Sequence, residues 1–232
     1  YDIIDDKGYS GWSSLASKPL PEIIRGVDQA EADANYAALV RTIVESGASK
    51  YAQSVEAVPD VGKYVFLPMQ VMNDTVAQLA YIDGLNLLRA LAKWGETSSY
   101  KVVVKRHPRC TIKAVAEAIE AEARAGRIIV SNAPVHDLIS GAECVVTVNS
   151  GVGAESLLHL KPVVTTGGSD YAAATRVART IPELMSALEH VGTLPTSQED
   201  LRKFLWVFTK RYQVHHTNAD DVGARLLQLM PR

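Results

Sequence analysis

A glycine-containing turn suited to binding a phosphate follows one of the apolar runs of the chain. Residues 149–153 read Asn-Ser-Gly-Val-Gly and stand between the run Cys144–Val148 and an apolar helical stretch. Glycines allow a tight turn and close approach of the backbone, and a helix start presents N–H groups to an anion. The Ser150 hydroxyl could add a hydrogen bond to a phosphate, and a plain helix cap is the structural alternative. The pattern is neither a complete dinucleotide fingerprint nor a P-loop.

A cluster of basic side chains follows another apolar run. Residues 105–109 read Lys-Arg-His-Pro-Arg, and Pro108 is expected to end the strand and set the following turn. A histidine flanked by Lys105 and Arg106 suits an anionic ligand, since its own charge is adjustable near neutral pH. We therefore expect His107 to contact an anion and Arg109 to be solvated.

Four carboxylates could take part in chemistry, and each has a structural alternative. Asp74 precedes a long helical stretch, where it could cap the helix or act as a base or nucleophile. Glu155 falls in the first turn of a helix, where the helix dipole favours it and where it could bind ribose hydroxyls. Asp5 and Asp6 suit a surface turn, and an acid/base role would require the N-terminal segment to fold over the site.

Other kinds of catalytic centre are not indicated. The sequence has no HExxH and no CxxC, and the adjacent His215 and His216 would diverge on a regular element, so no metal site is predicted. No Gly-x-Ser-x-Gly elbow is present, which argues against an α/β-hydrolase. Cys110 and Cys144 are predicted to be buried thiols of a protein in the reducing cytoplasm.

Short apolar runs must position these polar residues. They hold β-branched residues and little alternation, which indicates strands buried on both faces. The predicted strands are Tyr64–Pro68, Lys101–Lys105, Arg127–Val130, Cys144–Val148 and Pro162–Thr166, with a weaker one over Thr175–Arg179. Helical stretches separate them, so the predicted fold class is α/β, with a Rossmann-like doubly wound parallel sheet. Ligands bind such sheets at the carboxyl ends of the strands, where the candidate residues concentrate.

The predicted helices and domains complete this picture. The predicted helices are about Pro21–Glu45, Thr75–Trp94, Ile112–Ala125, Val135–Ser140, Ala154–Leu160, Ile181–Val191, Gln198–Tyr212 and Ala219–Met230. We expect an N-terminal segment over residues 1–62, with an acidic, glycine-containing loop and one helix. Residues 63–232 are expected to form the Rossmann-like domain with its C-terminal helices.

Composition excludes several broad classes of protein. The 232 residues are 47% hydrophobic and 22% charged, which is ordinary for a globular chain and argues against disorder or a coiled coil. The net charge of -2 gives no basic excess for nucleic acid. No apolar run approaches the length that a membrane span needs.

Three stretches of the sequence resemble the capsule polysaccharide biosynthesis family of bacterial glycosyltransferases. They are VVTVNSGVGAESLLHLKPVVTTGGSDY (Val145–Tyr171), LPMQVMNDT (Leu67–Thr75) and VVVKRHP (Val102–Pro108). The resemblance covers roughly residues 64–172 in separate blocks. The N-terminal DDKGYSGW is a looser match, because Lys7 interrupts the acidic-acidic-Gly pattern of the family. The family includes β-Kdo transferases.

This resemblance implies a fold and a reaction. The implied fold is GT-B, of which residues 63–232 would be the donor-binding domain. Too few residues precede that domain for a full first domain, so the chain is expected to be a fragment or a reduced form. The implied reaction is retaining transfer of Kdo from CMP-Kdo to a glycan or glycolipid acceptor, without a metal or other cofactor. The expected location is cytoplasmic, or peripheral at the inner membrane through the acceptor, with no nucleic-acid partner.

The resemblance also implies roles for individual residues. Asp74 would be the nucleophile at the anomeric carbon, and His107 would bind the donor phosphate and stabilise the leaving CMP. Asp5 or Asp6 would serve the acceptor hydroxyl as acid or base. The remaining candidates would bind the donor: Gln70, Lys105, Asn149, Ser150, Gly151 and Glu155.

Two alternatives remain open from the sequence. The first is a transferase of the same architecture that uses CMP-sialic acid or a UDP- or GDP-sugar. The second is a non-catalytic domain that binds a nucleotide or takes part in assembly.

Overall fold

A six-stranded, all-parallel sheet forms the centre of the molecule. The computed structural model describes all residues except 1, 4, 50, 215–217 and 230–232. The sheet strands are β2 (Tyr64–Pro68), β3 (Lys101–Lys105), β4 (Ile129–Val130), β5 (Cys144–Thr147), β6 (Val163–Thr165) and β7 (Arg176–Val177). Their spatial order is β4-β3-β2-β5-β6-β7. This is the doubly wound order, which confirms the predicted fold class, and its direction reverses between β2 and β5.

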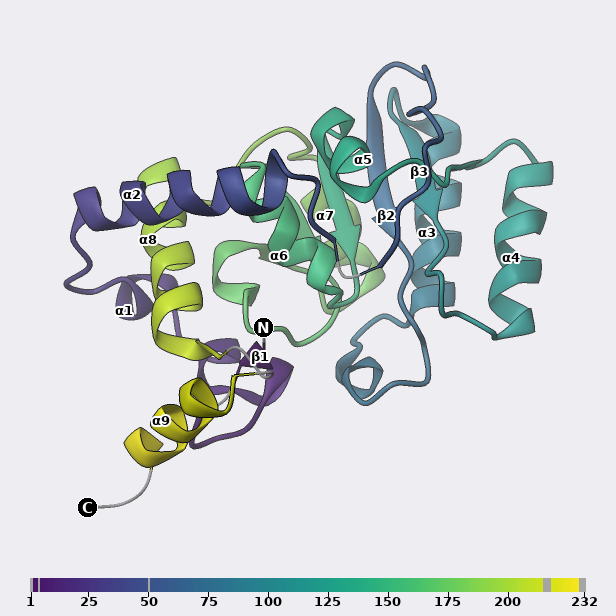
Figure 1. Ribbon diagram of the computed structural model, residues 1–232. Helices are drawn as coiled ribbons and strands as arrows, with labels where there is room; N and C mark the ends of the chain where they lie inside the picture. The colour runs from purple at the N-terminus through teal and green to yellow at the C-terminus, as the bar shows by residue number, and fades with distance from the viewer. Residues whose placement is uncertain (1, 4, 50, 215–217, 230–232) are drawn as a thin grey trace.

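Helices cover both faces of the sheet, so the central strands β2, β5 and β6 are buried on both sides (Figure 1). One face carries α3 (Gly84–Thr97), α4 (Lys113–Arg124) and α7 (Ile181–Leu188); the other carries α5 (Val135–Gly141), α6 (Gly151–Leu158) and α8 (Gln198–Val207). Along β2, Tyr64 and Phe66 enter the core under α5 and α6, whereas Val65 and Leu67 enter the core under α3. Because successive side chains point to opposite faces, both kinds of position must be apolar, which explains the uninterrupted apolar runs.

The N-terminal segment packs against the C-terminal elements. Strand β1 (Asp2–Ile3) pairs antiparallel with β8 (Gln213–Val214), and α1 (Leu20–Ile23) and α2 (Gln29–Leu39) lie against α8 (Figure 1). Side chains from residues 1–62 therefore share a core with α6 and α8. Short turns of 3₁₀ or π helix occur at Ser10–Trp12, Ser14–Ala16, Val40–Val44, η4 (Val76–Leu79), Ala172–Ala174 and Phe208–Tyr212, and α9 (Ala219–Leu229) follows β8.

Two predicted helices are wrong in extent. The single helix predicted over Pro21–Glu45 is broken, because Gly26 takes a φ of +72° and ends the first piece. A new helix, α2, then starts where the Asp28 side chain accepts a hydrogen bond of 3.0 Å from the N–H of Glu31. The second helix, predicted from Thr75, begins at Gly84.

The start of that second helix is set by a different cap. Asp83 accepts hydrogen bonds of 3.0 Å from the N–H groups of Leu85 and Asn86, which fixes the first turn of α3. Of residues 75–82, which were predicted to be helical, only Val76–Leu79 form a helical turn, the short η4.

Among the described residues, no helix is both long enough and apolar enough to cross a membrane. Cys110 and Cys144 are buried free thiols, as predicted.

Candidate active site at the carboxyl edge of the sheet

A pocket of about 430 Å³ opens at the carboxyl edge of the sheet, where β2 and β5 adjoin. It lies at the point where the strand order reverses, which is the usual ligand site of a doubly wound sheet. The candidate residues that line it are Gln70, Asp74, Lys105, His107, Asn149, Ser150, Gly151 and Glu155. The structure therefore brings together side chains that follow three different strands, in a volume suited to a small ligand.

Ser150 fixes the start of α6 on the rim of the pocket. Its hydroxyl accepts a hydrogen bond of 3.3 Å from the N–H of Val152, and its carbonyl accepts one of 2.5 Å from the Tyr171 hydroxyl. A Cβ on Gly153 would lie 2.5 Å from that hydroxyl, so this glycine is required by packing. A Cβ on Gly151 would meet none of the described atoms within 4 Å. Gly151 thus leaves the first turn of α6 open to an anion.

Gln70 and Asn149 hydrogen-bond to each other across the switch point, where the strand order reverses between β2 and β5. We refer to this pair as the rim clamp. The Gln70 amide donates to Asn149 Oδ1 at 2.8 Å, and the backbone N–H of Asn149 donates to Gln70 Oε1 at 3.1 Å. The Asn149 amide also donates to the carbonyls of Val76 at 2.8 Å and Gly168 at 3.0 Å. Both side chains are buried, and their bonds hold three rim segments together. Their geometry indicates that they position the pocket wall.

Two cations of the basic cluster at the end of β3, Lys105 and Arg106, bind backbone carbonyls and also line the pocket. Lys105 Nζ donates to the carbonyls of Asn132 and Ala133, both at 2.7 Å, and its desolvation lowers its pKa despite the nearby carboxylate of Glu56. The Arg106 guanidinium donates to the Cys110 carbonyl at 2.7 Å. Both cations therefore brace backbone segments, although they also line the pocket.

His107 is held in one tautomer when neutral. Its Nδ1 accepts a hydrogen bond of 3.1 Å from the backbone N–H of Arg109. The ring proton of neutral His107 consequently sits on Nε2, which becomes the donor. The Tyr51 ring stands edge-on to the imidazole with centroids 5.1 Å apart. A phosphate oxygen in the pocket could accept from Nε2 whether His107 is neutral or charged.

The two pocket carboxylates differ sharply in environment. Asp74 is exposed, and its Oδ1 accepts a hydrogen bond of 2.9 Å from the N–H of Ala77. Glu155 is half-buried, its burial raises its pKa, and nearby His136 opposes that rise. Glu155 Oε2 is buried without a hydrogen-bond partner among the described atoms. A ligand hydroxyl could satisfy that oxygen, because a buried polar atom left unpaired costs stability.

A histidine pair adjoins this region on the α5–α6 side. His136 Nδ1 and His159 Nε2 lie 2.9 Å apart, and His136 Nε2 lies 2.9 Å from the carbonyl of Ala48. A carbonyl only accepts, so His136 Nε2 carries a hydrogen and its Nδ1, when neutral, accepts from His159. Burial, followed by the charges of His136 and Lys161, lowers the pKa of His159 to about 4.

Ser49 and residues 51–54 form a wall of the pocket that the sequence patterns did not indicate. Tyr51 and Gln53 from this segment line the pocket. Gln53 Oε1 accepts a hydrogen bond of 2.9 Å from the N–H of Val135, the first residue of α5. No local pattern marks this irregular segment as part of the pocket, since the hydrogen bond that ties it to α5 comes from a residue far along the chain.

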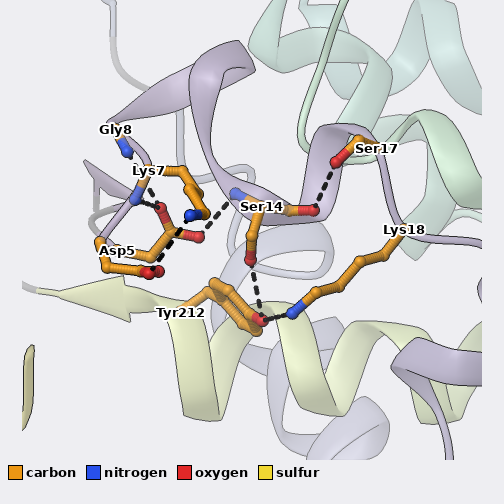
Figure 2. A network of polar contacts seen from close by, with 8 residues as sticks. Asp5, Lys7, Gly8, Ser14, Ser17, Lys18 and Tyr212 are labelled. Atoms are coloured by element: carbon orange, nitrogen blue, oxygen red, sulfur yellow. Dashed lines mark hydrogen bonds and ion pairs between the residues drawn. The ribbon is translucent and has the colours of Figure 1, made fainter.

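Asp5 and Asp6 do not line the pocket. Asp5 Oδ1 accepts from the N–H groups of Lys7 at 2.9 Å and Gly8 at 3.1 Å, and Oδ2 accepts from that of Ser14 at 2.6 Å (Figure 2). Burial acts to raise the pKa of Asp5, but these hydrogen bonds hold it below its ordinary value. Asp6 is exposed and pairs with Lys7 at 3.8 Å. Asp5 therefore organises the N-terminal loop.

Comparison with known protein families gives a match over residues 24–175 to the profile described as capsule polysaccharide biosynthesis protein. The protein FixF of Sinorhizobium fredii is 33% identical over 154 residues, which are 62% of this chain and 37% of FixF. The chain thus corresponds to well under half of that relative.

Solved structures with the same fold include two from Thermosulfurimonas dismutans. KpsC described as a β-Kdo 2,7 transferase superposes with a TM-score of 0.53 and 22% identity, over 82% of this chain and 59% of that one. A second KpsC structure, described as a β-Kdo 2,4 transferase, also superposes with a TM-score of 0.53. Its identity is 19%, over 84% of this chain and 63% of that one. At these identities the likeness establishes the fold, and the chain spans less than two thirds of either structure.

Proposed function

The chain belongs to the capsule polysaccharide biosynthesis protein family, and from this premise we propose that it is the donor-binding part of a glycosyltransferase. We propose further that the donor is CMP-Kdo and that the sugar is transferred with retention to a surface glycan. The observation that carries the proposal is the pocket at the switch point, which Asp74, His107, Ser150 and Glu155 line together. The fold shared with the two KpsC structures, which are described as β-Kdo transferases, supports Kdo as the sugar.

In this scheme the donor phosphate lies at the open start of α6. His107 Nε2 and the Ser150 hydroxyl donate hydrogen bonds to it, and Glu155 accepts one from a ribose hydroxyl. These groups stabilise the negative charge that grows on the departing CMP, and the scheme needs no metal or other cofactor for that purpose. The rim clamp of Gln70 and Asn149 keeps these donors in place before the ligand binds.

The chemical steps assign Asp74 as nucleophile. Its carboxylate attacks the anomeric carbon through an oxocarbenium-like state, while the bond from that carbon to the phosphate oxygen breaks and CMP leaves with the electron pair. An acceptor hydroxyl then attacks the same carbon, displaces the Asp74 carboxylate and gives up its proton to a base. Two inversions at one carbon amount to retention.

A panel of nucleotides tests the donor class directly. We expect CMP to raise the melting temperature of the whole chain more than UMP, UDP or GDP at equal concentration, since a ligand of the folded state stabilises it by mass action. Titration calorimetry would then give the CMP affinity. A clear preference for UDP or GDP would replace CMP-Kdo by another donor, and binding of CMP without release of CMP from CMP-Kdo in the presence of acceptor would favour a non-catalytic domain.

A further inference from the structure

A second hollow, of about 450 Å³, lies between α3 and the segment that leads from β7 into α7. We refer to it as the α3–α7 groove, and Tyr81, Asn86, Arg89, Lys93, Arg179 and Ile181 are among its lining residues. It shares no lining residue with the pocket of the candidate active site. Val76, at the start of η4, lines the pocket, whereas Tyr81, just beyond the end of η4, lines the groove. The two hollows are therefore neighbours along one short segment.

The groove carries an excess of positive charge on an acidic chain. In the described part of the chain, Arg89, Lys93 and Arg179 form no ion pair. Asp83 lines the groove as well, but its oxygens accept hydrogen bonds from two backbone N–H groups and from the Asn86 amide. The three cations are thus available to an anion from solution, and Arg89 and Lys93 stand one helical turn apart on α3.

An aromatic ring lies among these cations. Tyr81 is 47% exposed, and the Arg179 guanidinium carbon lies 5.4 Å from the centre of its ring. Ile181 beside it is 40% exposed. A flat, half-exposed ring offers an apolar face on which a pyranose ring can stack, while a fixed guanidinium recognises a carboxylate. Ring and cations together suit a sugar that carries a carboxylate.

We propose that the α3–α7 groove binds an acidic glycan, a chain of carboxylate-bearing sugars, outside the catalytic pocket. The acidic-sugar character of the ligand rests on the proposed function, and the location rests on the charge and the exposed ring of the groove. A glycan held there would lie beside the site at which the next sugar is added, and would keep a growing chain from diffusing away. Three cations beside an aromatic ring suit such a chain better than a nucleic-acid backbone, which needs a longer basic track.

The test uses tetragalacturonic acid as the acidic probe and maltotetraose as its neutral counterpart. Calorimetry at low salt should show that the whole chain binds the acidic tetrasaccharide and not the neutral one. The double variant Arg89→Glu/Lys93→Glu should weaken this binding by about tenfold or more, because it replaces attraction by repulsion at two contacts. Tyr81→Ala should weaken it by about threefold or more through loss of the stacking face.

The matched control is Lys63→Glu/Lys101→Glu. It lowers the net charge by the same amount, and its exposed side chains flank the amino ends of β2 and β3, opposite the carboxyl edge. We expect it to change the affinity by less than about twofold, since screened charges at long range contribute little. Equal weakening by both double variants, no binding of the acidic probe by the wild-type chain, or equal binding of a thymidine oligonucleotide would each overturn the proposal.

CMP binding, measured on the same variants, separates this inference from the proposed function. The groove variants should bind CMP as the wild-type chain does, which also verifies that they are folded. Loss of the acidic probe with CMP binding intact locates the glycan in the groove. Binding of the acidic probe by a chain that does not bind CMP would remove the proposed donor and leave the groove as a glycan site.

Discussion

The Ser13 hydroxyl donates a hydrogen bond of 2.5 Å to the buried carboxyl group of Asp170. This bond ties the N-terminal segment to the loop after β6. The next residue of that loop, Tyr171, donates to the Ser150 carbonyl at the pocket rim. Burial raises the pKa of Asp170 to about 7; the bond from Ser13 opposes the rise, and the charge of Asp5 adds to it. The contact between the two segments is therefore linked to protonation near neutral pH.

The first prediction concerns the pH dependence of stability. Because the pKa of Asp170 is higher in the folded chain than in the unfolded one, the folded state binds its proton more tightly, and stability falls as pH rises toward about 7. Asp170→Asn keeps an acceptor for Ser13 and removes the charge. From pH 5 to pH 8 the wild-type chain should lose stability that the variant keeps. The free energy of unfolding of the variant minus that of the wild-type chain should therefore increase by about 2–3 kcal/mol.

Denaturant unfolding at the two pH values measures this difference. Asp6→Asn is the control, because Asp6 is exposed and its removal should leave the pH profile parallel to that of the wild-type chain. Asp5 does not interfere, since its lowered pKa places its titration below this window. A constant difference between Asp170→Asn and the wild-type chain across the window would contradict the prediction.

The second prediction concerns the rim clamp. Asn149→Ala removes the partner of Gln70 and the donors to the carbonyls of Val76 and Gly168, so it should lower the free energy of unfolding by about 2–4 kcal/mol. Gln70→Ala and the double variant complete a cycle, in which we expect a coupling of about 1 kcal/mol or more. Gln78→Ala, an exposed amide on η4, is the control. Additive losses would show that the two amides act independently.

The third prediction tests the phosphate contacts. His107→Ala and Ser150→Ala should each weaken CMP binding by about 1–3 kcal/mol, the usual scale for a hydrogen bond to a charged group. Ser150→Ala also removes a helix cap, so it needs a control that loses only a cap. Ser197→Ala serves, because Ser197 caps α8 by accepting from the N–H of Asp200 and lies outside the pocket. Calorimetry that finds unchanged CMP affinity in both pocket variants would remove the phosphate assignment.

The fourth prediction distinguishes a nucleophile from a cap. Asp74→Asn keeps an oxygen for the N–H of Ala77, so stability should change by less than about 1 kcal/mol and CMP should still bind. If Asp74 is the nucleophile, its replacement should abolish transfer from CMP-Kdo and should also remove any sugar adduct on the enzyme that mass spectrometry detects. Transfer is assayed with the longer protein if the chain alone is inactive. Asp28→Asn, at the cap of α2, is the control, and near-normal transfer by Asp74→Asn would leave Asp74 as a cap.

The sheet and its rim follow from local sequence, and several other features do not. Uninterrupted β-branched runs mark buried strands, and the strand ends then place Asp74, His107 and Ser150 at one edge. The start of a helix is harder to predict, because Asp74 and Asp83 are both residues that cap helices. In the structure α3 begins after Asp83, which accepts from two N–H groups, and Asp74 accepts from the N–H of Ala77 in η4. The breaks and ends of helices depend similarly on single residues such as Gly26.

A long-range contact accounts for the pocket wall that the sequence patterns did not indicate. That wall, formed by Ser49 and residues 51–54, is held by the hydrogen bond from the N–H of Val135 to Gln53, which lies 82 residues away in the chain. The family resemblance implied an acid/base role at the acceptor for Asp5, whereas in the structure its oxygens accept hydrogen bonds from the backbone of its own loop. The wall has no signature in the local sequence, because it is decided by which segments fold against each other. The turn at Asp5 is local, and adjacent carboxylates beside glycines already suited it.

The pairing of β2 with β5 has a consequence for folding kinetics. Strand β2 can join β3 before β5, because fewer residues separate β2 from β3 than from β5, but the pocket exists only once β5 has docked on the other side of β2. The Gln70–Asn149 contact closes a loop of 79 residues, and such non-local closure is slow. Nucleotide binding, followed in real time during refolding, should therefore arise with the last phase of sheet assembly, and a nascent chain should acquire it only after β5 has left the ribosome.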